Sequence, residues 1–253
     1  FTVSIMLSFS LVGFGQGKVN TKLDADYSAI DFYFDSLYAF KFKEYLAEKD
    51  KVAQDGLYNR IDQAIQNSST VKTIELTNTS IEKLPKGFEK LTELESIVFR
   101  NCKKLDLTTT FKQLEKLPNL KSLEISYSNK YQIPNSISKL VNLENLNLEG
   151  NKFVVLPEDF ASLKNLKTLI VSQNSVINET LLFEKLQKMP NLETVEAAYC
   201  QIRELPEVSY SMNTLKLNGN MIKSVSSNVL INFLDFTFLL PSTVILLILI
   251  LLK

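Results

Sequence analysis

One nine-residue pattern recurs seven times between Val71 and Ile222 and constrains the fold more than any other feature of the chain. Each copy has apolar residues at positions 1, 4 and 6, and a small polar residue or cysteine at position 9. Position 1 is Val71, Leu94, Leu120, Leu143, Leu166, Leu192 and Met212, so successive copies start 23, 26, 23, 23, 26 and 20 residues apart. A motif returning at such intervals is typical of a solenoid, in which each copy forms one coil.

The spacing of the copies itself repeats, because the second and fifth copies start 72 residues apart. The segment 94–120 aligns without a gap on 166–192, with Phe111 and Leu114 matching Phe183 and Leu186. We infer a duplication of three copies. The apolar spacing within these two longer copies predicts a short helix on the side of the coil opposite the strands.

Alternation within each copy predicts a strand at positions 3 to 7. Side chains at positions 4 and 6 then point into a core shared between stacked coils, while those at positions 3, 5 and 7 face solvent. An asparagine at position 9 lies in the turn after the strand, where its amide bonds backbone groups of neighbouring coils. Thr79, Cys102, Ser128 and Cys200 are smaller substitutes with weaker hydrogen bonding.

A family resemblance follows from this pattern together with the Leu84-Pro85, Ile133-Pro134, Leu156-Pro157 and Leu205-Pro206 pairs and a short predicted helix at 57–67. Residues 57–224 resemble bacterial leucine-rich repeat proteins of the xLP type. The resemblance implies an α/β fold: a leucine-rich repeat solenoid with a curved parallel sheet of seven repeats and an N-terminal helical cap. It also implies protein or peptide recognition with no chemistry of its own. The chain departs from the family pattern at position 9 of repeats one, two, three and six.

The chain divides into four predicted segments. Residues 1–17 contain an uncharged apolar run that ends in small residues, which predicts a signal peptide in a fragment missing its first residues; the alternative is an apolar strand. Residues 18–70 form a helical cap or, alternatively, a separate ligand-binding element. Residues 71–228 form the solenoid, and residues 229–253 form a hydrophobic tail.

Three interpretations of the tail stay open. A spanning helix needs about 20 mostly apolar residues, and the run reaches that length only by including Asp235 or Pro241. The tail is therefore a membrane anchor, a C-terminal cap of the solenoid, or an aberrant reading-frame end. The repeat register disappears after Val225.

Composition excludes several kinds of chemistry. The chain has no histidine, which rules out histidine-based triads, general bases and metal ligands. Its two cysteines are too few for an all-cysteine zinc site, so we predict no enzyme, no cofactor and no metal. Because Cys102 and Cys200 lie four coils apart, we predict buried free thiols and no disulfide between them. Balanced charge, with 28 basic and 28 acidic residues, gives no general attraction to nucleic acid.

The predicted binding surface is the solvent side of the sheet, at positions 3, 5, 7 and 8. It is polar and mildly acidic. Position 8 supplies Tyr127 and Tyr199, which are either interface anchors or residues chosen for β-propensity and edge packing. The candidate protein-binding residues are Arg100, Glu124, Tyr127, Asn147, Ile170, Glu196 and Tyr199.

The sequence thus predicts an exported, non-enzymatic protein that binds a protein or peptide through a concave sheet. It would be secreted, or held at the cell surface or membrane through residues 229–253. Two alternatives are a structural surface spacer and the recognition arm of a larger enzyme.

Overall fold

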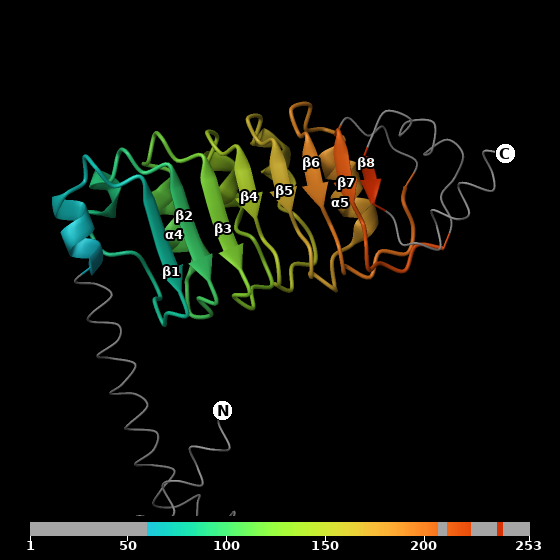
Figure 1. Ribbon diagram of the computed structural model, residues 1–253, viewed down its shortest axis with the longest axis horizontal. Helices are drawn as coiled ribbons and strands as arrows, with labels where there is room; N and C mark the ends of the chain where they lie inside the picture. The colour runs from blue at the N-terminus through green and yellow to red at the C-terminus, as the bar shows by residue number, and fades with distance from the viewer. Residues whose placement is uncertain (1–59, 207–211, 224–236, 240–253) are drawn as a thin grey trace, which may run out of the picture. The chain divides into compact units, whose positions relative to one another are not determined.

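The computed structural model describes residues 60–206, 212–223 and 237–239. Eight strands form one parallel sheet, in the order in which they occur in the chain (Figure 1). They are β1 (Thr73–Thr77), β2 (Ser96–Arg100), β3 (Ser122–Ser126), β4 (Asn145–Asn147), β5 (Thr168–Ile170), β6 (Thr194–Glu196), β7 (Thr214–Lys216) and β8 (Thr237–Leu239). The first seven begin at position 3 of the seven predicted repeats. The predicted solenoid is therefore confirmed.

The eighth strand is a difference from the seven-repeat prediction. Thr237 of β8 pairs in parallel with Thr214 of β7, which is the 23-residue step of the shorter coils. When the eighth repeat is numbered like the others, its position 1 is Asp235, a charged residue where the pattern requires an apolar one. The repeat is therefore hidden in the sequence. Most of the predicted tail, 229–253, lies outside the described residues.

Helical segments form the other side of the first five coils, behind the strands in Figure 1. The two 26-residue coils carry α4 (Leu107–Leu114) and α5 (Glu179–Leu186), as predicted. Asp106 and Asn178, also 72 residues apart, accept hydrogen bonds from the backbone N–H groups of Thr108 and Leu181 at the helix starts. Shorter coils carry the 3₁₀ helices η2 (Phe88–Lys90), η3 (Asn135–Lys139) and η4 (Glu158–Ser162).

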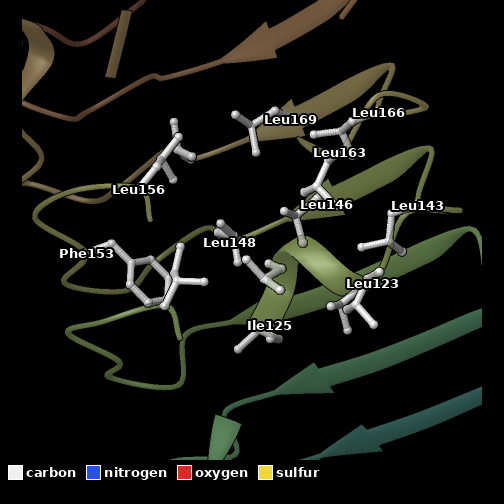
Figure 2. Close-up of a cluster of buried hydrophobic side chains, with 14 of the residues drawn as sticks. Leu123, Ile125, Leu143, Leu146, Leu148, Phe153, Leu156, Leu163, Leu166 and Leu169 are labelled. Carbon is white, nitrogen blue, oxygen red and sulfur yellow. The ribbon is translucent and has the colours of Figure 1, made fainter. Parts of the chain in front are cut away.

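The core is a continuous stack of inward-facing side chains. Leucines and isoleucines at positions 4 and 6 of neighbouring coils meet aromatic residues from the return segments, as Figure 2 shows around Leu146 and Phe153. No coil buries its apolar face alone, because each row is completed by the next coil. Stability is therefore shared along the array.

Position 9 closes each turn as the sequence predicts. Asn151, Asn174 and Asn220 donate to backbone carbonyls of their own and the preceding coil and accept from preceding backbone N–H groups. The smaller substitutes make fewer bonds: the Cys102 thiol donates to the Leu76 carbonyl at 3.1 Å, and the Cys200 thiol to the Val171 carbonyl at 3.2 Å.

The described part of the predicted cap contains a helix over residues 60–66. Ile61 is buried and Ile65 packs against the core, so this helix covers apolar surface of the first coil. Residues 1–59, which include the predicted signal peptide and most of the cap, lie outside the described residues. Among the described segments, no helix is long and apolar enough to cross a membrane.

Candidate binding surface

The solvent side of the sheet places five predicted binding residues on adjacent strands. Position 5 forms one row across the sheet, in which Glu124, Asn147, Ile170 and Glu196 are consecutive register partners. Arg100 lies in the position-7 row, opposite Ser126. We call this surface, together with Tyr127 and Tyr199 at position 8 beside it, the strand face.

Two carboxylates of the strand face are paired within the protein. Glu124 accepts hydrogen bonds from Arg100 Nε at 2.9 Å and from the Ser126 hydroxyl at 2.5 Å, and its side chain is only 17% exposed. Lys216 Nζ lies 2.5 Å from Glu196. Because adjacent coils neutralise these two groups, the face carries less free negative charge than its acidic residues suggest.

Position 8 has a property that sequence reasoning missed: its backbone is left-handed in all seven predicted repeats. The residues are Asn78, Asn101, Tyr127, Gly150, Gln173, Tyr199 and Gly219, with φ between 51° and 70°. This geometry carries each tyrosine ring over the glycine of the next coil. A Cβ on Gly150 would lie 2.4 Å from Tyr127 Cδ1, and one on Gly219 would lie 2.3 Å from Tyr199 Cδ1.

The two tyrosines are held in different ways. Tyr127 is 42% exposed, and its hydroxyl accepts a hydrogen bond from Gln173 Nε2 at 3.0 Å. Burial, and secondly the neighbouring Glu149, raise the pKa of its phenol. Tyr199 is 58% exposed, and its hydroxyl has no hydrogen-bond partner among the described residues. Both rings therefore rest on glycine and leave their other face to solvent.

Replacing Gly150 with alanine is expected to destabilise the fold by about 1–3 kcal/mol, because the residue combines a positive φ with the Tyr127 contact. Gly87→Ala is the matched control: Gly87 also has a positive φ, but its Cβ would meet nothing closer than 3.6 Å. Chemical denaturation measures both. Equal losses, or an unchanged Gly150→Ala loss in a Tyr127→Ala background, would show that the ring contact contributes nothing.

The edge where the strands begin is polar and shows two regular ladders that sequence reasoning also missed. Position 2 alternates in charge along the first six coils, through Lys72, Glu95, Lys121, Glu144, Lys167 and Glu193. Ion pairs of 2.8 Å join Lys72 to Glu95 and Lys167 to Glu144. Asparagines just before position 1 donate to the preceding coil: Asn119, Asn142, Asn165 and Asn191. Both ladders were readable by aligning the repeats.

The cysteines fit the predicted burial. Cys102 and Cys200 are buried free thiols in the second and sixth coils. Burial raises the pKa of Cys200 to about 11, which keeps it protonated and unreactive at neutral pH. Within the described segments, no group of three His, Cys, Asp or Glu residues is arranged to hold a metal ion.

A family model described as a leucine-rich repeat region matches residues 97–235, more than half of the chain. No curated protein sequence matches. Among solved structures, the leucine-rich repeat domain of the type III effector XopL is 19% identical with a TM-score of 0.56, and the match covers 73% of each chain.

Two further structures are similar. The Toll–Spätzle complex of Drosophila is 19% identical with a TM-score of 0.55, and the match covers 69% of this chain and 25% of that one. A leucine-rich repeat protein of Leptospira interrogans is 18% identical with a TM-score of 0.46, and the match covers 72% of this chain and 57% of that one. The chain therefore spans less than two thirds of these two proteins. At these identities the likeness to the XopL domain and to Toll–Spätzle concerns the fold alone.

Proposed function

The chain belongs to the leucine-rich repeat family, and from that premise we propose that it is a non-enzymatic protein that binds a protein or peptide through its strand face. The fold supports a protein-binding repeat module in general. One solved structure with this fold is a protein–protein complex, that of Toll with Spätzle. The residues that would contact the partner are Arg100, Glu124, Tyr127, Asn147, Ile170, Glu196 and Tyr199.

The observation that carries the proposal is the pair of exposed tyrosines resting on glycines. Their rings lose little freedom on binding because packing already fixes them, and preorganised aromatic anchors bind at lower entropic cost. They stand three coils apart, or about 14 Å at the usual strand spacing. One partner segment can therefore reach both.

We also propose that the protein is exported from the cytoplasm, and the apolar run at residues 1–15 and the hydrophobic tail at 229–253 support this proposal. The tail would hold it at the membrane or cell surface; without that attachment it would be secreted. Fractionation of the source cells tests this proposal, because recovery in the cytoplasmic fraction alone would contradict export.

Tyr127→Ala and Tyr199→Ala are each expected to weaken binding by about 2 kcal/mol. The partner is first captured from the source's envelope fraction, purified, and titrated against each variant by calorimetry. Lys112→Ala, an exposed change on α4 behind the sheet, is the control and leaves affinity unchanged. Denaturation of each variant separates lost contacts from lost folding. Undiminished binding by both tyrosine variants, with loss in Lys112→Ala, would contradict the strand face as the site.

A further inference from the structure

Among the described residues, the exposed large apolar side chains are concentrated along the edge of the sheet that is formed by the C-terminal ends of the strands. Of the nine such residues, Val141 lies just before a strand, β4. The other eight lie after the strands of coils three to seven: Tyr127, Tyr131, Val154, Val155, Val176, Leu181, Tyr199 and Met221. The opposite edge carries the asparagine and lysine–glutamate ladders. The two edges of the sheet therefore differ in chemistry.

Five of these residues lie in the loops after the strands of coils three to five and in the first turn of α5, and we call them the loop rim: Tyr131, Val154, Val155, Val176 and Leu181. Backbone hydrogen bonds hold these loops side by side. The Lys152 N–H donates to the Lys130 carbonyl at 2.8 Å, and the Asn178 N–H donates to the Val154 carbonyl at 2.7 Å. Apolar groups gathered on a fixed surface in this way mark interaction sites in soluble proteins.

The rim is basic at its end nearest the second coil. The loops after β2, β3 and β4 carry Lys103, Lys104, Lys130 and Lys152 against two acids: Asp106, whose side chain caps α4, and Glu149, which accepts a hydrogen bond from Gln173. Lys152 Nζ lies 5.1 Å from the centre of the Tyr131 ring and 3.1 Å from its hydroxyl. Lys130 Nζ donates to the Lys103 and Leu105 carbonyls, which fixes its charge beside the apolar groups.

We infer that the loop rim binds an acidic segment of a protein partner that also presents aliphatic or aromatic side chains. Apolar contact supplies the buried centre and the lysines meet the acidic groups. The inference rests on the proposed protein-binding function and adds a second surface to the strand face. A protein is favoured over an anionic membrane because Lys130 Nζ already donates to two backbone carbonyls, which leaves three lysines, fewer than the roughly four to eight of a lipid-binding cluster.

A random-peptide library displayed on phage, panned against the immobilised full chain, provides the probe. Enriched peptides are synthesised with a fluorophore and titrated by anisotropy. We expect them to be rich in acidic and apolar residues and to bind more weakly as salt rises. Val154→Ser and Lys152→Glu should each reduce affinity about tenfold. Val141→Ser, an equally exposed valine at the opposite ends of the strands, is the matched control and leaves the affinity unchanged.

Other outcomes overturn the inference. Enriched peptides that are lost on Ile170→Ser and kept by Val154→Ser would place binding on the strand face, which leaves the proposed function standing without the rim. A library that yields no acidic, apolar peptides contradicts the rim directly. Tight, Val154-dependent binding to phosphatidylserine vesicles, with no peptide enrichment, would identify the rim as a membrane surface.

Discussion

Replacing Leu169 with alanine is expected to lower the free energy of unfolding by about 2–5 kcal/mol. Leu169 is fully buried in β5, between its register partners Leu146 of β4 and Val195 of β6. Removal of its side chain leaves a cavity lined by two neighbouring coils, neither of which can collapse into the gap without disturbing the next. Urea denaturation measures the loss.

The adjacent Ile170 supplies the control, because its side chain lies on the solvent side of the same strand. Ile170→Ala should cost much less than Leu169→Ala. Leu146→Ala, one coil away in the same inward row, should match Leu169→Ala. Equal losses at positions 169 and 170 would show that burial in the stack does not decide the cost.

The inward rows were predictable because they follow from local spacing alone. Apolar residues at positions 4 and 6 imply which side chains point inward, and the constant step implies which of them stack. Leu146 and Leu169 are therefore buried where the sequence places them. The eighth strand was not predicted because Asp235 breaks the pattern by which repeats are recognised.

Contacts between coils were harder to predict because they depend on side-chain direction as well as spacing. Tyr127 and Gly150 occupy the same repeat position, yet their contact depends on a left-handed backbone that the motif does not reveal. The Arg100–Glu124 pair was also not predictable from the motif, because it joins position 7 of one coil to position 5 of the next. The strand-face residues could be predicted as a set, but their internal pairing could not.

The repeat pattern does not predict the loop rim, for a different reason. Its apolar residues occupy positions 11 to 13 and the first turn of α5, where core and exposed side chains do not alternate regularly. Phe153 is fully buried while the adjacent Val154 and Val155 are exposed. Without that regularity, the sequence does not separate a core residue from a surface residue in these loops.

Asn174→Ala is expected to destabilise the protein by about 1–3 kcal/mol, because it leaves buried backbone groups without partners. The side chain of Asn174 is fully buried. Its Nδ2 donates to the Leu148 carbonyl at 3.0 Å and the Val171 carbonyl at 2.8 Å, and its Oδ1 accepts from the Phe153 N–H at 3.1 Å. Alanine can neither donate nor accept these hydrogen bonds, so the three backbone groups lose this partner.

Asn165, the last residue of the preceding coil, offers a matched control. Its Nδ2 also donates to a backbone carbonyl, that of Val141 at 2.9 Å, but the bond is exposed, so water can replace it after Asn165→Ala. Asn174→Ser should fall between the two, since Ser128 at the same repeat position accepts from the Cys102 N–H and donates to the Ser126 carbonyl. Chemical denaturation of the three variants should therefore rank Asn174→Ala as the least stable and Asn165→Ala as the most stable. A loss of stability for Asn165→Ala equal to that for Asn174→Ala would mean that the buried asparagine at position 9 stabilises the solenoid no more than an exposed hydrogen bond does.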